Sequence, residues 1–421
     1  CVFEDSGVSK LQPLSLTRPA FDLRCGAATL LERQLRLFPG AEVGVQVRPE
    51  LAALCRREHP GLAVNEPGWL VRGPVILINA RWLAPAALPH LGGATAAGLA
   101  GGEPAFVALG AAEARGLSPD NLHWQLDEWK QALPHVAAGG SLVEHPWGLV
   151  EANGAALEQD YSHWRRAREA RGGAGLTVVG PPERFLADPS ARVEPMVLID
   201  TTNGPVLLDR GAVVQAFSRL EGPCYVGPGT QLHAARVRDA SFGPQCRVGG
   251  AVESSVIQGY SNKAHEGFLG HSYLGEWVNF GSGTQTSDLR TDYGTVSMRS
   301  NGRRVDTGRL KVGSFVGDHV KTSMGVLFNT GSAVGPFGLL LASGGLLPRS
   351  LPPFGQYAHG HVAERSDLRE MFGTAAAVMA RRGREWTEDH AEFYFDLFEQ
   401  TAAERRQAVR EGEQRRLRRV V

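Results

Sequence analysis

The stretch Ser255–Thr284 reads SVIQGYSNKAHEGFLGHSYLGEWVNFGSGT, and in it an apolar residue is repeatedly followed by glycine. The pairs Leu269-Gly270, Leu274-Gly275 and Phe280-Gly281 recur at a spacing of roughly six residues. The same pairing continues on both sides, at Val226-Gly227, Phe242-Gly243, Val248-Gly249, Val312-Gly313, Val316-Gly317 and Val334-Gly335. Short repeats of this kind build a parallel β-helix, because one apolar side chain per strand points inward and glycine permits the tight corner. The stretch therefore predicts a hexapeptide-repeat β-helix.

The segment Asn262–Glu266 interrupts this repeat, and it begins a second pattern that ends at Thr284. The pattern runs through Lys263, His265 and Asn279 to the closing Gly281-Ser-Gly-Thr. It resembles the C-terminal half of the bacterial bifunctional glucosamine-1-phosphate acetyltransferases/N-acetylglucosamine-1-phosphate uridyltransferases. Their left-handed β-helix carries Lys-x-x-His-Leu-Thr-Tyr and, further on, Asn-Ile-Gly-x-Gly-Thr. The resemblance implies a left-handed β-helix that transfers an acyl group from acetyl-CoA or another acyl-CoA to an amino sugar.

The resemblance also implies roles for individual side chains. His265 is the expected general base, since imidazole titrates near neutral pH. Asn279 is expected to touch the sugar or the acyl group, and Asp288 could polarise His265 from a neighbouring chain. Phe268 stands where the family has tyrosine, so one phenolic donor is lost. The alternative that His265 is a structural loop histidine remains open.

Two lysines and one more histidine lie in the same region. Lys263 and Lys311 are expected to meet the phosphates of the sugar or of CoA, with Lys263 on the substrate and Lys311 on the cofactor, although solvated lysines are equally compatible with the sequence. His271 lies next to a coil corner and is expected to be a surface side chain. In the resembling family, active sites lie between neighbouring chains, so a homotrimer is expected.

The front of the chain predicts an α/β domain. Apolar runs at 42–47 and 75–78 suit strands, and Leu51–Arg57 suits a helix between them, which indicates a Rossmann-like mixed sheet. The loop Ser6–Ala20 resembles the opening Gly-x-Gly-Thr-Arg-Leu-x-Pro-Leu-Thr-x-x-x-Pro-Lys of sugar nucleotidyltransferases, because its two prolines keep their spacing. It is most similar to a divergent sugar-nucleotidyltransferase-like group that is fused to a left-handed β-helix.

The departures from that opening bear on catalysis. The lysine after the second proline is Ala20, and no carboxylate stands in Asn79-Ala80-Arg81, where the family holds its metal. Mg²⁺ therefore loses a protein ligand, and no metal ligand is predicted in this chain. Lys10, Arg18 and Arg24 are expected to meet the phosphates of a sugar phosphate or nucleotide sugar directly. The alternative is that the two arginines pair with Glu4, Asp5 or Asp22.

Composition and charge narrow the range of expected binding partners and cellular locations. The chain has 421 residues, with 44 basic and 44 acidic side chains, so its formal charge is zero. A neutral balance argues against nucleic acid or a membrane surface as the partner. The absence of a signal-peptide pattern or a long apolar run favours the cytoplasm.

Three regions are expected along the chain. Residues 1–185 form the nucleotidyltransferase-like domain, residues 186–355 the β-helix, and residues 356–421 a helical extension. Within the β-helix, Tyr293–Asp306 predicts a hairpin around Asn301-Gly302, and a loop that leaves a solenoid usually marks a site. The Arg- and Glu-rich end of the chain is expected to be a solvated or trimer-clasping helix.

Three functions are compatible with these features. The first is a transferase that acylates an amino sugar on the β-helix and has a degenerate front domain. The second is an active sugar-1-phosphate nucleotidyltransferase, with the β-helix as its trimer scaffold. The third is a non-catalytic sugar-nucleotide-binding protein.

Overall fold

The computed structural model describes residues 1–88, 95–118, 122–165, 176–300 and 302–420. The chain forms two compact units. The first comprises residues 1–11, 15–23 and 28–145, and the second comprises residues 12–14, 24–27 and 146–421. Among the described residues, no helix has the length and apolarity needed to cross a membrane.

The first unit is built on a seven-stranded mixed sheet with the strand order β10-β8-β9-β6-β1-β4-β5. Strands β1, β4, β5 and β6 run parallel, and β9 pairs antiparallel with both β6 and β8. The strand bounds are β1 (Val2–Phe3), β4 (Gly44–Gln46), β5 (Ala63–Val64), β6 (Val75–Asn79), β8 (Ala96–Ala100), β9 (Glu103–Leu109) and β10 (His135–Ala137). A small separate ladder joins β7 (Trp82–Leu83) to β11 (Ser141–Leu142). The predicted α/β domain with a mixed sheet is confirmed.

Helices of the first unit connect these strands and supply its core. They are α1 (Leu30–Leu35), α2 (Ala52–Glu58), α3 (Pro67–Leu70), α4 (Ala111–Ala114) and α5 (Leu122–Ala132). Helix α1 begins at a capping box in which Thr29 and Glu32 bond each other's main chain. One core cluster joins Phe3 of β1 and Leu77 of β6 to Leu126 of α5, all of them buried.

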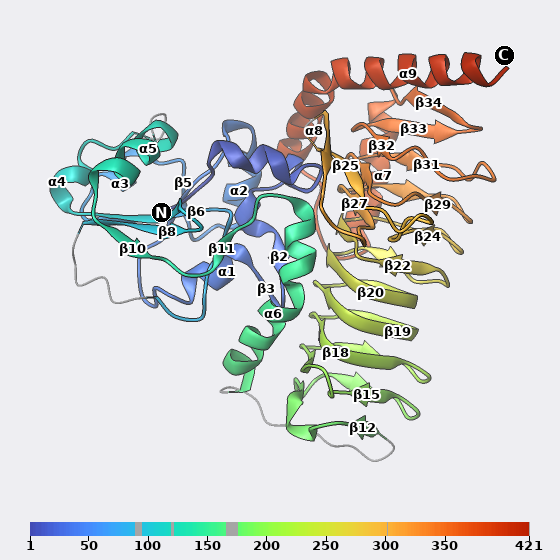
Figure 1. The fold of residues 1–421 in the computed structure, drawn as a ribbon, viewed down its shortest axis with the longest axis horizontal. Helices are drawn as coiled ribbons and strands as arrows, with labels where there is room; N and C mark the ends of the chain where they lie inside the picture. Colours follow the sequence, from blue (N-terminus) through green and yellow to red (C-terminus); the bar gives the residue numbers. More distant parts are fainter. Residues whose placement is uncertain (89–94, 119–121, 166–175, 301, 421) are drawn as a thin grey trace. The chain divides into compact units, whose positions relative to one another are not determined.

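The second unit is dominated by parallel ladders. In Figure 1 its strands are stacked one above another from β12 to β34. Leu220 pairs with Val237, Val237 with Val252, and Val252 with Leu269, so each coil advances the chain by roughly three six-residue repeats. The predicted parallel β-helix is confirmed, and its left-handed sense stays a prediction.

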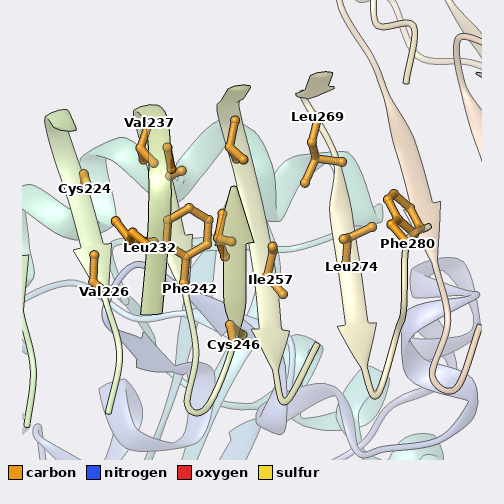
Figure 2. Packing of buried hydrophobic residues seen from close by; sticks show 14 of the residues in the cluster. Cys224, Val226, Leu232, Val237, Phe242, Cys246, Ile257, Leu269, Leu274 and Phe280 are labelled. Carbon is orange, nitrogen blue, oxygen red and sulfur yellow. The ribbon is translucent and has the colours of Figure 1, made fainter. Parts of the chain in front are cut away.

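The stacked strands of this unit are two to thirteen residues long, and β34 differs from the stacked strands before it in pairing antiparallel, with β33. They are β12 (Thr177–Val179), β13 (Phe185–Ala187), β14 (Arg192–Val193), β15 (Leu198–Asp200), β16 (Val206–Leu208), β17 (Val213–Val214), β18 (Arg219–Val226), β19 (Gln231–Phe242), β20 (Arg247–Gly259), β21 (Asn262–Lys263), β22 (Phe268–Gly270), β23 (Tyr273–Glu276), β24 (Gln285–Thr286), β27 (Ser314–Val316), β28 (Lys321–Thr322), β29 (Leu327–Phe328), β30 (Ser332–Val334), β31 (Leu339–Leu340), β32 (Ser350–Leu351), β33 (Gly355–Ala358) and β34 (His361–Glu364). Aliphatic and aromatic side chains from successive coils fill the interior, as Figure 2 shows for Leu232, Ile257 and Leu274.

A hairpin leaves the β-helix between β24 and β27. Its strands β25 (Ser297–Ser300) and β26 (Arg303–Asp306) pair antiparallel, and Ser300 lies opposite Arg303. This confirms the predicted hairpin. Of its expected turn residues, Asn301 lies outside the described residues, and Gly302 has the positive φ of 72° that such a turn requires.

The helices of the second unit are α6 (Pro146–Arg165), which precedes the β-helix, and α7 (Leu368–Ala380), α8 (Glu388–Gln400) and α9 (Ala402–Val420), which follow it. An aromatic column holds the C-terminal helices in place. One corner of five coils carries Tyr260, Trp277, His319, Phe337 and Phe354, whose rings stack in sequence. Tyr394 of α8 packs edge-on against His319 and Phe337.

One arginine near the start of α9 is buried against the β-helix. Arg405 is 1% exposed, its Nε donates to Glu364 at 2.9 Å, and its guanidinium lies 3.7 Å from the centre of the Phe398 ring. Arg405 is therefore satisfied by a carboxylate and an aromatic face, while residues 403, 404, 406 and 407 beside it are exposed, so the expected solvated or trimer-clasping helix stays a prediction.

Candidate active site

The His265 loop connects β21 to β22 and presents an exposed imidazole. Lys263 lies opposite Val248 in the ladder, at a position where the repeat places an inward aliphatic side chain. Its side chain is 2% exposed, and its Nζ donates to the main-chain oxygen of Gly249 at 2.9 Å and to that of His265 at 2.6 Å. Burial lowers the pKa of Lys263 to about 8. The buried ammonium therefore fixes the backbone of the loop, a position that favours support of His265 over contact with substrate.

Asn279 belongs to a row of polar residues that crosses one face of the β-helix. Asn262, Asn279 and Lys321 are consecutive partners in the parallel ladder. The Nδ2 of Asn262 donates to the Oδ1 of Asn279 at 3.2 Å, and Arg382 donates to the Oδ1 of Asn262 at 3.0 Å. The Nζ of Lys321 donates to the main-chain oxygen of Trp277, and burial lowers its pKa to about 8. The half-buried Asn279 is thus held in a fixed orientation, one coil beyond the strand that leads into the His265 loop.

Positive charge accumulates on the same side of the β-helix as the loop. His233 has a lowered pKa, because it is partly buried and lies near Arg247 and His265. Arg247 pairs with Asn262 in the ladder, and its own pKa is lowered by burial and by Arg382. Arg247 and Arg382 make the surroundings of His265 suitable for an anionic group such as a phosphate, whereas the lowered pKa of His233 favours its neutral form.

Asp288 is placed against His271. Its Oδ2 lies 2.7 Å from the Nδ1 of His271, and the two side chains are 12% and 21% exposed. Burial alone would raise the pKa of Asp288, but the hydrogen bond from His271 and the charges of His271 and Lys311 outweigh it and lower the pKa. The expectation that His271 is only a surface side chain is wrong, because the carboxylate draws it against the β-helix. Whether Asp288 of a neighbouring chain acts on His265 stays a prediction.

Phe268 and Lys311 lie around this pair. A Cβ atom added to Gly270 would meet the Phe268 ring at 2.4 Å and the Oδ2 of Asp288 at 2.7 Å, so ring and carboxylate meet over that glycine. The Nζ of Lys311 lies 3.9 Å from Glu253, and its side chain is 47% exposed. An ion pair this loose leaves the ammonium largely in solvent, and the role of Lys311 in binding the cofactor stays a prediction.

The three cations predicted for the front domain occupy different settings. Lys10 is exposed, and Arg18 is half-buried in the first unit. Arg24 belongs to the second unit, where it is 7% exposed and its Nη1 donates to the main-chain oxygen of Ala27 at 2.7 Å. That these side chains meet a phosphate stays a prediction.

Asp5 lies two residues after β1, and its partner Asn79 is the last residue of β6. Arg81 donates to its two oxygens at 2.7 and 2.6 Å, Asn79 donates at 2.8 Å, and the main chain of Gly7 donates at 3.0 Å. The guanidinium thus occupies the position next to Asp5 that a cation would need, and in the described part of the chain no three His, Cys, Asp or Glu side chains gather around one point. The residues present do not fit Mg²⁺.

Comparisons with known proteins relate this chain to sugar transferases. Residues 1–169 match the family model described as sugar nucleotidyl transferase. A bifunctional sugar-1-phosphate nucleotidylyltransferase/acetyltransferase of Sulfurisphaera tokodaii is 38% identical over 93 residues, which are 22% of this chain and 23% of the relative. The resemblance to the bifunctional family is confirmed. A bifunctional protein GlmU of Methanocaldococcus jannaschii is 38% identical over 84 residues, 20% of each chain. One of Rippkaea orientalis is 42% identical over 73 residues, 17% of this chain and 15% of the relative.

The matched segments span less than a quarter of these members of the bifunctional family. A solved structure of the polysialic acid O-acetyltransferase OatWY overlaps 45% of this chain and 88% of its own, at 10% identity and a TM-score of 0.18. That score is too low to indicate a shared fold, so the β-helix described above rests on its own strand pairing.

Sequence reasoning missed three features of the candidate site. They are the pairing of His271 with Asp288, the burial of Lys263, and the use of Arg81 as the partner of Asp5. The spacing of 17 residues from Ser254 to His271 and from His271 to Asp288 is one coil in each case, and it could have indicated a shared corner.

Proposed function

We propose that this chain transfers an acyl group from acyl-CoA to the amino group of an amino-sugar phosphate or nucleotide sugar, on the surface of its β-helix. The observation that carries the proposal is the exposed His265, on a loop whose main chain is held by the ammonium of Lys263. A rigidly held base beside positive charge suits a substrate that carries both an amine and a phosphate. The similarity to bifunctional nucleotidylyltransferase/acetyltransferases supports the same reaction class.

Each residue has a distinct task in this reaction. When bound, acyl-CoA supplies an acyl group activated as a thioester. His265 accepts the proton that the attacking amine loses, and Asn279 orients the sugar or the acyl oxygen through its amide. Lys311 and the cations around His265 bind phosphates, and Phe268 supplies an apolar wall.

The front domain is proposed to bind a sugar phosphate or nucleotide sugar without transferring a nucleotide. The bidentate pair between Arg81 and Asp5 favours this assignment, because nucleotidyl transfer relies on a metal to offset developing charge. A working nucleotidyltransferase with a scaffold β-helix, and a non-catalytic binding protein, are the rival functions.

We further propose that the active form is a homotrimer, with each His265 loop completed by a neighbouring chain. Light scattering at micromolar concentration is expected to give three times the mass of the chain. A monomer with full acyl transfer would exclude a shared site.

A panel of acceptors separates the three functions. The full chain is incubated with acetyl-CoA and glucosamine 1-phosphate or galactosamine 1-phosphate, and thiol release is followed. In a second arm, it is incubated with UTP, Mg²⁺ and N-acetylglucosamine 1-phosphate, and pyrophosphate release is followed. We expect thiol release that falls about 10²–10⁴-fold in His265→Ala. Pyrophosphate release without thiol release would favour the nucleotidyltransferase, and neither release would favour the binding protein.

A further inference from the structure

His271 and Asp288 form a histidine–carboxylate contact of the kind that supports a catalytic base, at another corner of the β-helix. Ser254 and His271 occupy the same corner of consecutive coils, each with a left-handed backbone, with φ values of 42° and 44°. The next coil brings Asp288 to this corner, where its carboxylate holds the Nδ1 of His271 at 2.7 Å. The pair therefore lies across the three-residue strand β22 from the His265 loop.

The hydrogen bond to Asp288 decides which imidazole nitrogen can act. With the carboxylate ionised, Nδ1 carries the hydrogen and donates it, so Nε2 holds the lone pair. The same contact fixes the ring orientation and stabilises the imidazolium that forms when Nε2 takes a proton. In the part of the chain that the structure describes, no carboxylate forms a comparable bond with His265.

Charged and hydrogen-bonding groups surround His271 and Asp288. The hairpin insertion leaves the β-helix directly after Asp288 and returns at Lys311, since Leu289 bridges to Lys311. The Oγ of Ser254 donates to the Oδ2 of Asp239 at 3.0 Å, and burial raises the pKa of that carboxyl group. Hydrogen-bond donors, hydrogen-bond acceptors and charged groups thus lie together at one edge of the β-helix, next to the His265 loop.

We propose that His271 is a second general base, oriented by Asp288, which transfers an acyl group from acyl-CoA to a hydroxyl group of a carbohydrate. An amine attacks a thioester through its lone pair and gives up a proton to a base afterwards, whereas a hydroxyl must lose its proton as it attacks, so it depends more on an oriented base. A carbohydrate acceptor fits the sugar nucleotidyl transferase match of residues 1–169. The proposal shares only the acyl-CoA donor with the function proposed above.

The reaction balances without a further reactant. The Nε2 of His271 takes the hydroxyl proton while the oxygen forms a bond to the thioester carbonyl carbon. The carbon–sulfur bond then breaks, and the imidazolium returns its proton to the CoA sulfur. The products are a sugar ester and the free thiol, and no group is oxidised or reduced.

The test uses the full chain with acetyl-CoA and acceptors that carry hydroxyl groups but no free amine. The probes are glucose 1-phosphate, galactose 1-phosphate and N-acetylglucosamine 1-phosphate at millimolar concentration, with thiol release and the ester product measured. The variants are His271→Asn, which tolerates the left-handed backbone, and Asp288→Asn, which keeps the shape but not the charge. We expect hydroxyl acylation to fall about 10²–10⁴-fold in both variants and to persist in His265→Ala.

With amino-sugar acceptors, acylation is expected to fall in His265→Ala and to persist in His271→Asn, which separates this proposal from the function of His265. Loss of amine acylation alone would leave the His271 proposal standing. No thiol release with any hydroxyl acceptor would overturn it, and so would equal hydroxyl acylation by wild type and Asp288→Asn. If His271→Asn unfolds, as judged by circular dichroism, Asp288→Asn and His265→Ala still decide the outcome.

Discussion

Replacing Lys263 with methionine tests whether the buried ammonium holds the His265 loop. Methionine has a similar length but cannot make the bonds of 2.9 and 2.6 Å to the main-chain oxygens of Gly249 and His265. Because a displacement of about 1 Å in an active site can cost about 10²-fold in rate, we expect kcat for amine acylation to fall about 10- to 100-fold. KM for acyl-CoA is expected to change little, since Lys263 is buried away from solvent.

The stability of this variant follows from two opposing effects. Burial lowers the pKa of Lys263 from 10.5 to about 8, which disfavours the charged form by about 3 kcal/mol. Loss of two hydrogen bonds to a charged donor costs about 1.5–3 kcal/mol each. The free energy of unfolding is therefore expected to fall by no more than about 3 kcal/mol. Since the folded state releases its proton first, the stability of wild type relative to the variant should rise between pH of about 8 and 10.5.

Lys321→Met is the matched control. Lys321 is half-buried, also has a pKa of about 8, and also donates to a main-chain oxygen, but that oxygen belongs to Trp277. Steady-state kinetics of both variants give kcat and KM, and urea unfolding gives the free energy of unfolding of each. Equal kcat in wild type and Lys263→Met, with both folded, would refute the role of the ammonium in positioning His265.

Three further predictions concern other parts of the chain. Asn279→Ala is expected to raise KM for the sugar more than it lowers kcat, as measured by initial rates, if the amide binds ground and transition states alike. Asp288→Asn is expected to lower the free energy of unfolding near neutral pH by about 1–3 kcal/mol, because a carboxylate that bonds His271 is lost. Since the pKa of Asp288 is lowered on folding, this difference should shrink as pH falls below about 4 in acid titrations of both proteins. Arg81→Ala is expected to leave pyrophosphate release undetectable in the UTP arm, because it frees Asp5 without supplying a second metal ligand.

The repeat made the β-helix predictable, because an inward aliphatic side chain and a glycine corner are both local requirements. The hairpin was predictable for the same reason, since its turn chemistry is contained in two adjacent residues. The mixed sheet of the front domain followed from apolar runs at β4 and β6.

The contacts between coils were not predictable from local pattern. His271 meets Asp288 only because one coil separates them, and their spacing of 17 residues indicates a contact only once the length of a coil is known. Lys263 reads as a surface side chain, yet the ladder places it opposite Val248, inside the β-helix. Arg24 likewise reads as a phosphate ligand, but its main-chain nitrogen donates to Gln258 and Tyr273, and the residue is buried among them.

The central claim is acyl transfer to an amine on the β-helix, and product identification tests it most directly. The full chain is incubated with acetyl-CoA and glucosamine 1-phosphate, and the sugar product is examined by mass spectrometry and NMR. We predict an N-acetylated sugar phosphate in equal amount to the released thiol, and its loss in His265→Ala. An unmodified amino sugar, or the same yield of product from His265→Ala, would contradict the account.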